Sequence, residues 1–239
     1  MKIVLLGKDG QVGWELQRSL APLGELIALG RVEADLENPA ALLEKLRVIK
    51  PTVIVNAAAY TAVDRAETEV DRAQMINAAA PAALAKFAAE SGAWLIHYST
   101  DYVFDGTKAG PYVEGDLTGP LSVYGRSKLD GERAITGSAC RHLIFRTSWV
   151  FAARGGNFAK TMLKLASERD RLSVVNDQFG APTSAELIAD VTALCLYRIA
   201  RRDAPAPAPV SGIYHLVAAG ETTWFEFARL VLAEAERLG

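Results

Sequence analysis

The chain has 239 residues, half of them hydrophobic, with 26 basic and 28 acidic side chains and a formal net charge of −2. This balance gives no electrostatic reason to expect a nucleic acid or an anionic membrane as partner, and no apolar run approaches the roughly 20 residues of a membrane span. The length allows one large domain, or a domain with a small second lobe, around a sizeable core.

Short apolar runs alternate with longer amphipathic segments from the first residues onward. The first run ends in a glycine turn and is expected to be a strand, not a signal peptide. Several runs are continuously apolar, as parallel strands covered on both faces are, and the longer segments repeat apolar residues near the helical period. The alternation predicts an α/β fold of right-handed βαβ units, a Rossmann-type doubly wound parallel sheet. The expected strands are 2–6, 25–29, 52–56, 93–98, 143–147, 172–175 and 213–217, and the expected helices are 12–21, 39–49, 75–91, 123–135, 158–168, 185–201 and 223–238.

The first predicted strand runs into a G-x-x-G-x-x-G turn and then directly into a helix. Glycines permit a tight turn and let backbone N–H groups approach a pyrophosphate at the helix N-terminus. A plain strand–helix turn is the alternative, but the position after an N-terminal strand favours a dinucleotide site. The candidate cofactor-binding residues of this turn are Gly7, Gly10, Gln11, Val12 and Gly13.

The ends of the second and third predicted strands add further candidates. The second strand ends at Gly30-Arg31, without the acidic residue that NAD sites often place there to bind the ribose. The Arg31 guanidinium favours an NADP 2′-phosphate, although it is equally consistent with a solvated surface side chain. Asp35 and Leu36 follow and are candidates to flank the adenine. After the third strand, the small residues 57–59 allow a cofactor to lie close to the backbone, with core packing as the alternative.

A Tyr/Lys pair follows the fourth predicted strand. Tyr124 and Lys128 are four residues apart in a helical segment and therefore share one helix face. Reduction of a ketone needs a proton on oxygen, and a free phenol, with a pKa of about 10, exchanges its proton poorly near neutral pH. A nearby lysine cation is expected to lower the pKa of the phenol and to hold the cofactor ribose. Thr100, at the carboxyl end of the fourth strand, is expected to orient the carbonyl oxygen.

The remaining reactive side chains are scattered along the chain. Cys140 and Cys195 lie far apart and outside any C-x-x-C pattern, which predicts a reduced, cytoplasmic protein. His97, His142 and His215 each lie in or beside a predicted strand and are expected to be structural. No metal ligands are assigned from these residues.

Six stretches of the chain carry a resemblance to a known family: 7–16, 55–64, 97–106, 120–129, 145–150 and 176–183. Two of their motifs, Ser-Thr-Asp-Tyr-Val-Phe and Arg-Thr-Ser-Trp-Val, are far more specific than the fold motifs. The chain resembles the extended short-chain dehydrogenases/reductases and, within them, the dTDP-4-dehydrorhamnose reductase family. The resemblance implies NADPH or NADH as cofactor. It also implies reduction of the C4 keto group of dTDP-4-dehydro-L-rhamnose to dTDP-L-rhamnose, in nucleotide-sugar synthesis for cell-surface polysaccharides such as lipopolysaccharide.

The resemblance also implies roles for individual residues. Tyr124 would donate the proton, Thr100 and Asp101 would touch the sugar, and Trp149 would pack against the substrate. Gly10, Gln11 and Val12 would bind the cofactor pyrophosphate, and Asp35 and Leu36 would border the adenine. Ala59, Tyr60 and Thr61 would line the cofactor cleft, and Tyr98 would form its floor. Lys128 would bind the nicotinamide ribose.

The same resemblance bears on assembly and domain organisation. It implies a homodimer around a magnesium ion, with Glu15 and Glu186 as the counterparts of the ligands, although both are also typical of ordinary helix-surface carboxylates. Residues 1–148 are expected to form mainly the dinucleotide-binding domain, and 149–239 to interleave that domain with a small substrate lobe. Family members normally continue for several tens of residues, so the lobe is expected to be incomplete here. The Pro/Ala-rich segment 203–209 is expected to be an exposed spacer.

Three other functions fit parts of the pattern. A nucleotide-sugar epimerase or dehydratase shares the glycine turn and the Tyr/Lys pair, but a dehydratase is expected to carry Asp-Glu after Thr100, where this chain has Asp101-Tyr102. A non-catalytic regulatory subunit of the methionine adenosyltransferase type resembles these reductases and works by binding a partner. Retention of Thr100, Tyr124 and Lys128 favours an enzyme over that subunit. A scaffold that only binds a nucleotide is the third alternative.

Overall fold

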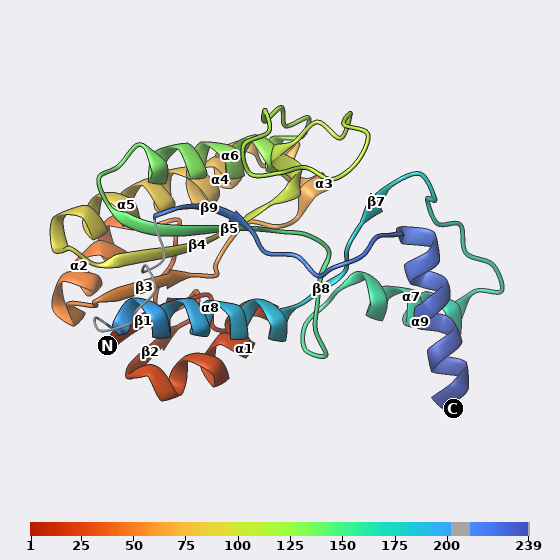
Figure 1. The fold of residues 1–239 in the computed structure, drawn as a ribbon, viewed down its shortest axis with the longest axis horizontal. Helices are drawn as coiled ribbons and strands as arrows, with labels where there is room; N and C mark the ends of the chain where they lie inside the picture. The colour runs from red at the N-terminus through yellow and green to blue at the C-terminus, as the bar shows by residue number, and fades with distance from the viewer. Residues whose placement is uncertain (202–210, 239) are drawn as a thin grey trace.

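A computed structural model describes residues 1–201 and 211–238. Six parallel strands form the main sheet in the order β2-β1-β3-β4-β5-β9, with helices on both of its faces (Figure 1). The predicted doubly wound α/β sheet is confirmed. The predicted spacer 203–209 lies outside the described residues. The strands are β1 (Lys2–Leu6), β2 (Glu25–Leu29), β3 (Val53–Asn56), β4 (Trp94–Thr100), β5 (Arg141–Thr147) and β9 (Gly212–His215).

The central strands are buried on both faces, which explains their continuously apolar sequences. Successive residues of a strand point to opposite faces, so Ile54 packs into one core and Val55, the next residue, into the other. One core lies under α2, α5 and α6, and the other lies under α1 and α8 (Figure 1). The helices of the main body are α1 (Gln11–Leu20), α2 (Pro39–Ile49), α3 (Val63–Ala66), α4 (Val70–Gln74), α5 (Ala80–Ser91), α6 (Val123–Thr136) and α8 (Ala185–Ala200).

A smaller group of elements lies beyond the carboxyl end of β5, at the right of Figure 1. Helices α7 and α9 pack against each other there. Two short ladders accompany them, β6 with β8 in parallel and β7 with β10 antiparallel. The bounds are β6 (Val150–Phe151), α7 (Phe158–Glu168), β7 (Phe179–Gly180), β8 (Thr183–Ser184), β10 (Thr222–Thr223) and α9 (Trp224–Leu238).

The prediction of a strand at 172–175 is wrong. These residues form no ladder; Val175 is half exposed, and its carbonyl oxygen accepts a hydrogen bond from Phe225 N at 3.1 Å. Residues 172–175 cannot pair with β5 at the edge of the main sheet, because β9 already occupies that position. An apolar run therefore indicated a strand where the topology had no place for one.

The helix predicted at 75–91 begins differently. Met75–Ala79 form a π turn that continues α4, and regular α-helix starts only at Ala80. Pro81 has no N–H, so the α-helical bond to the Asn77 carbonyl cannot form. That carbonyl instead lies against α6, where a Cβ at Gly131 would come within 2.2 Å of it. A π turn of this kind often accompanies a functional site.

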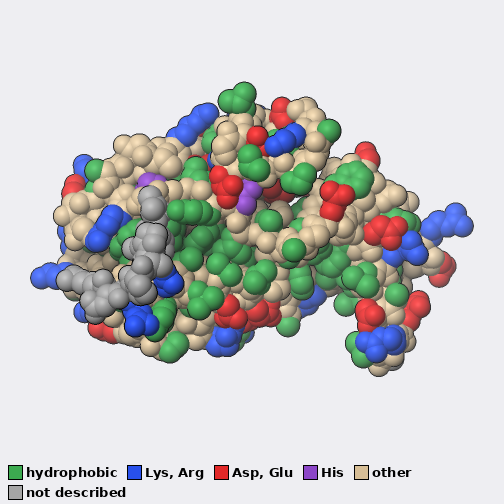
Figure 2. Space-filling model, viewed as in Figure 1, with side chains coloured by type: hydrophobic (Ala, Val, Ile, Leu, Met, Phe, Trp, Pro, Cys, Tyr) green, Lys and Arg blue, Asp and Glu red, His purple; other side chains and the backbone are tan. Residues whose placement is uncertain are grey.

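The surface agrees with the balanced charge of the sequence. Acidic and basic side chains are interspersed over the face shown in Figure 2 and do not gather into one large patch of either sign. Among the described residues, no helix combines the length and the apolar character that a membrane crossing requires.

Candidate active site

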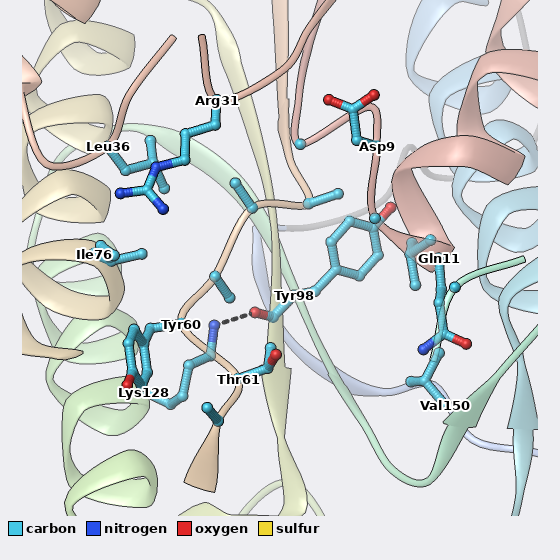
Figure 3. A pocket seen from close by; sticks show the side chains of 18 of the residues that line it. Asp9, Gln11, Arg31, Leu36, Tyr60, Thr61, Ile76, Tyr98, Lys128 and Val150 are labelled. Atoms are coloured by element: carbon cyan, nitrogen blue, oxygen red, sulfur yellow. Dashed lines mark hydrogen bonds between the residues drawn. The ribbon is translucent and has the colours of Figure 1, made fainter. Parts of the chain in front are cut away.

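A cavity of about 740 Å³ opens at the carboxyl ends of β1, β2, β3 and β4 (Figure 3). Ligands of doubly wound sheets bind at this edge, and the volume is typical of small-molecule sites. Arg31 and Leu36 lie together at one end of the cavity, and Gln11 and Val150 lie at the other. The sequence-predicted residues that line it are Gly7, Gly10, Gln11, Val12, Arg31, Asp35, Leu36, Ala59, Tyr60, Thr61, Tyr98, Tyr124 and Lys128.

The glycine turn brings the N-terminus of α1 to the cavity. Gly7 has a φ of 85°, and a Cβ there would lie 2.7 Å from the backbone nitrogen of Ala58. A Cβ at Gly13 would lie 1.9 Å from the Gly7 carbonyl oxygen, so Gly13 allows α1 to pack on the turn and does not itself face the cavity. Gly10 precedes the helix without a side-chain cap, which leaves the first helical N–H groups for an anion.

Three arginines line the cavity at and near its Arg31 end. Arg31 follows β2, whereas Arg65 of α3 and Arg72 of α4 come from a later part of the chain. Arg31 and Arg72 both form ion pairs with Glu37, with Arg72 Nε 2.6 Å from Glu37 Oε1. Arg65 pairs with Glu69. Sequence reasoning identified Arg31 and missed the other two, because no local pattern links their short helices to β2.

Asn77, in the π turn, holds the exit of β3. Its Oδ1 accepts a hydrogen bond from Tyr60 N at 2.9 Å, and its Nδ2 donates to Tyr60 O at 2.9 Å and to Ser127 Oγ at 3.0 Å. The Tyr60 hydroxyl donates to Glu69 Oε2 at 3.0 Å. Asn77 is buried and ties the cavity wall to α6, a role that the sequence analysis did not anticipate.

Helix α6 presents Tyr124 and Lys128 to the cavity on one face, as their spacing predicted. The side chains are 9% and 2% exposed. Gly125 lets α6 approach the segment after β4, since a Cβ there would lie 2.2 Å from the Tyr102 carbonyl oxygen. The Lys128 ammonium or amine donates to the Tyr98 carbonyl oxygen at 2.6 Å (Figure 3).

Thr100 connects Tyr124 with Asp101 at the end of β4. Its hydroxyl donates to Asp101 Oδ1 at 3.0 Å, accepts from Tyr102 N at 3.2 Å, and is hydrogen-bonded to the Tyr124 side chain. Burial raises the pKa of the Asp101 carboxyl above its ordinary value. The predicted proton donor therefore belongs to a short chain of polar groups.

The expectation that Lys128 lowers the pKa of Tyr124 is wrong. Burial raises the pKa of the Tyr124 phenol, and the hydrogen bond with Thr100 opposes this only in part. Burial also lowers the pKa of Lys128 to about 8. Burial is the main cause of both pKa shifts because both side chains lie in the protein interior. Tyr124 therefore holds its proton at neutral pH, as a proton donor must.

Tyr98 and Trp149, the two further aromatic candidates, lie in different surroundings. The Tyr98 ring lines the cavity, with its hydroxyl 2.8 Å from Thr192 Oγ1 of α8, and burial raises its pKa. Trp149 has a φ of 48° and stacks on Trp224 with ring centroids 3.6 Å apart. A Cβ at Gly180 would lie 2.6 Å from the Trp149 ring. Trp149 thus holds the smaller group of elements together, and its contact with a substrate remains a prediction.

The cavity also contains hydroxyl groups that lack a protein partner. Ser99 Oγ and Thr147 Oγ1 are buried without a hydrogen bond, and both residues line the cavity. Such hydroxyls beside a cavity keep a hydrogen bond available to a bound molecule or a water. Together with the uncapped helix N-terminus and the small side chains of 57–59, they fit a nicotinamide dinucleotide.

The residues implied in magnesium binding do not form a site within one chain. Glu15 lies on α1 and pairs with Arg18 at 3.5 Å, and Glu186 lies in the first turn of α8. In the described part of the chain, no three His, Cys, Asp or Glu side chains are placed to hold a metal ion. The magnesium prediction receives no support.

Comparison with known proteins gives consistent matches. A family model described as the RmlD substrate binding domain matches residues 1–238. The dTDP-4-dehydrorhamnose reductase of Salmonella typhimurium is 56% identical over 243 residues, which cover 100% of this chain and 80% of that protein. A dTDP-4-dehydrorhamnose reductase structure from Clostridium acetobutylicum has a TM-score of 0.88 at 37% identity and covers 98% of this chain and 80% of its own. The Bacillus anthracis enzyme in complex with NADP has a TM-score of 0.89 at 34% identity, covering 99% and 82%.

Proposed function

The chain belongs to the dTDP-4-dehydrorhamnose reductase family, and we propose that it reduces the C4 keto group of dTDP-4-dehydro-L-rhamnose to give dTDP-L-rhamnose. The reductant is NADPH, with NADH also used. The product serves nucleotide-sugar metabolism that supplies cell-surface polysaccharides. The observation that carries the proposal is the convergence of Tyr124, Lys128 and the glycine turn on one cavity.

The cofactor is held along the carboxyl edge of the sheet. The first N–H groups of α1, at Gln11 and Val12, bind the pyrophosphate, since a helix N-terminus favours an anion. Arg31 attracts the 2′-phosphate, and Leu36 covers the adenine. Tyr98 forms the floor. When bound, the reduced nicotinamide supplies the hydride.

The residues of the chain position the sugar and supply the proton. When the sugar binds, the Thr100 hydroxyl turns its hydrogen from Asp101 to the C4 oxygen, and the Tyr124 phenol transfers its proton to that oxygen as the carbonyl becomes an alcohol. The phenolate left at Tyr124 is stabilised by the Lys128 cation one helical turn away. Asp101 and Trp149 also contact the sugar. The bound cofactor and sugar displace water from the cavity, which strengthens these electrostatic interactions.

The experiment is to mix the protein with NADPH and dTDP-4-dehydro-L-rhamnose and to follow the loss of the reduced cofactor's absorbance together with the sugar product. We expect oxidation of NADPH that depends on the sugar and yields dTDP-L-rhamnose. NADPH binding without sugar-dependent oxidation would instead support the non-catalytic subunit. Interconversion of sugars without net NADPH consumption would support an epimerase.

The proposal also covers the cellular location, the partner and the assembly of the protein. We place the enzyme in the cytoplasm, where Cys140 and Cys195, which are free thiols, would stay reduced. The partner is a nucleotide sugar, and the assembly is a homodimer. Mass measurement in solution tests the last point.

A further inference from the structure

His97, predicted to be structural, contacts the catalytic lysine. It lies on β4, is 1% exposed, and places Nε2 3.3 Å from Lys128 Nζ. On its other side, Nδ1 lies 3.2 Å from Nδ2 of Asn56 on β3. The Asn56 amide is oriented in turn, because its Oδ1 accepts a hydrogen bond from Ala58 N at 3.3 Å. These contacts form one buried chain from the cavity wall to Lys128.

The chain of contacts determines where the imidazole carries its proton. The backbone N–H of Ala58 can only donate, so the oxygen of the Asn56 amide faces it and the NH2 group faces His97. That NH2 group can only donate, so Nδ1 of His97 must accept. A neutral imidazole with an accepting Nδ1 carries its hydrogen on Nε2. The Nε2–H bond therefore points at Lys128 Nζ.

An N–H directed at an ammonium opposes it, whereas the same N–H directed at a neutral amine forms a hydrogen bond with the nitrogen lone pair. The neutral amine of Lys128 can accept from His97 and still donate to the Tyr98 carbonyl oxygen at 2.6 Å. Burial also disfavours a charge on either side chain, and it lowers the pKa values of both His97 and Lys128.

We infer that His97 is a positioning residue that acts through Lys128: its ring, oriented by Asn56, disfavours the ammonium form and sets the pH at which Lys128 takes up a proton. The inference deepens the proposed function and rests on it for its catalytic meaning. The cation that stabilises the Tyr124 phenolate is present only below that pH, so the position of His97 sets the upper pH limit of the reaction.

The other charged groups around Lys128 are few. Glu132 lies one turn farther along α6 and favours the ammonium. Its charge is compensated by Arg146 of β5, which forms two hydrogen bonds with it. Tyr124 lies one turn earlier on α6 and is uncharged at neutral pH. The orientation of His97 is therefore the part of this environment that a single substitution can reverse.

The test is NMR of the ligand-free protein. With 15N-labelled histidine, the His97 ring is expected to carry its hydrogen on Nε2. With 13Cε-labelled lysine, the titration of Lys128 is followed in wild type, His97→Gln and Asn56→Leu. In His97→Gln, the glutamine oxygen can accept a hydrogen bond from the Lys128 ammonium. In Asn56→Leu, loss of the amide frees Nδ1 of His97 to carry the hydrogen, so that Nε2 can accept from the ammonium. Both variants are therefore expected to raise the Lys128 titration midpoint by roughly one pH unit.

The matched control is His142→Gln, which replaces another buried histidine of the sheet, one that contacts the Cys140 carbonyl oxygen. It should leave the Lys128 titration unchanged.

In assays of sugar reduction, His97→Gln should move the alkaline limb of the pH profile of kcat to higher pH by the same amount. A merely structural loss would lower kcat without moving that limb. An Nδ1–H tautomer, or a Lys128 midpoint unchanged in both variants, would overturn the inference. Failure of the proposed activity would leave both NMR measurements standing, so the two failures are distinguishable.

Discussion

Tyr124 is 9% exposed, its ring meets that of Tyr102 edge-on at 5.5 Å, and burial favours its protonated form. Tyr124→Phe keeps the ring and removes only the hydroxyl group that donates the proton. We expect turnover to fall by roughly 10² or more, the scale of general acid catalysis, while NADPH affinity changes little. Steady-state sugar reduction and fluorescence titration of NADPH measure the two quantities. Near-normal turnover in the Phe variant would show that Tyr124 is not the donor.

Cofactor choice depends on the Arg31 end of the cavity. The Arg31 side chain is 63% exposed and already paired with Glu37, so its attraction for a 2′-phosphate is discounted for solvent screening. We expect wild type to bind NADPH at least as well as NADH, and Arg31→Ala to weaken NADPH roughly fivefold with little effect on NADH. Titration of both cofactors checks this, with Arg47→Ala, outside the cavity, as the control. A preference for NADH that the Arg31 variant leaves unaltered would remove Arg31 from cofactor recognition.

The low pKa of Lys128 makes the stability of the fold depend on pH. Its folded value of about 8 lies below the ordinary 10.5. Below pH 8 the folded protein bears the full cost of a buried charge. Between pH 8 and 10.5 the unfolded chain binds a proton that the folded chain has released, so the free energy of unfolding contributed by Lys128 rises with pH.

Lys128→Met removes the charge and keeps the length of the side chain. At pH 7 we expect it to be more stable than wild type, by up to roughly 3 kcal/mol, reduced by about 1 kcal/mol for the lost hydrogen bond to Tyr98. The gain should vanish by about pH 10, and catalysis should be lost. Urea unfolding at both pH values measures the effect. A difference that stays constant with pH would contradict the assignment of a buried, titrating amine.

Helix α6 is joined to β5 by a buried ion pair. Arg146 donates from Nε to Glu132 Oε1 at 2.9 Å and from Nη2 to Oε2 at 2.7 Å, and the side chains are 5% and 2% exposed. Glu132→Leu leaves the guanidinium buried and unpaired, which should cost roughly 3–5 kcal/mol of unfolding free energy. The double variant Glu132→Leu with Arg146→Met should recover most of that loss. Urea denaturation of both variants checks this; a double variant no more stable than the single one would show that the pair is not coupled.

At the scale of the whole molecule, the cofactor cavity lies mainly against the main sheet, and, among the described residues, the smaller group that contains α7 and α9 reaches it only through Val150, Gly155 and Gly156. Trp224 of α9 stacks on Trp149 and lies 4.4 Å from the Phe158 ring of α7, centroid to centroid. Trp224→Ala should disorder that group and weaken sugar reduction at least tenfold, because remote contacts position the reacting carbon. NADPH affinity should stay within about twofold, since the glycine turn is untouched.

The matched control is Phe225→Ala, an exposed residue of the same helix, which should behave as wild type in both assays. Loss of NADPH binding in Trp224→Ala would show that the two parts fold as one unit. Unchanged sugar reduction would place the substrate elsewhere. NADPH titration and sugar kinetics on the two variants separate these outcomes.

The sequence by itself determined the strands of the main sheet, most of the longer helices and part of the local geometry of the site. A continuous apolar run reflects a strand buried on both faces, and a period of 3.6 residues reflects burial of one helix stripe, so β1, α2 and α7 have the predicted bounds. The glycine turn was recognisable because only glycine tolerates the φ of Gly7. The four-residue spacing of Tyr124 and Lys128 placed both on one face, since a helix repeats near that interval.

The tertiary structure decided everything that depends on how distant elements meet. Arg72 reaches the same carboxylate as Arg31, Asn77 holds Tyr60 across the π turn, and His97 meets Lys128 from another element. Residues 172–175 form no strand because β9 fills the sheet edge. Such contacts follow from packing and connectivity and not from local periodicity. For the same reason the pKa of Tyr124 lies on the opposite side of its ordinary value from the one expected: burial, which no sequence pattern states, is the main cause of the shift.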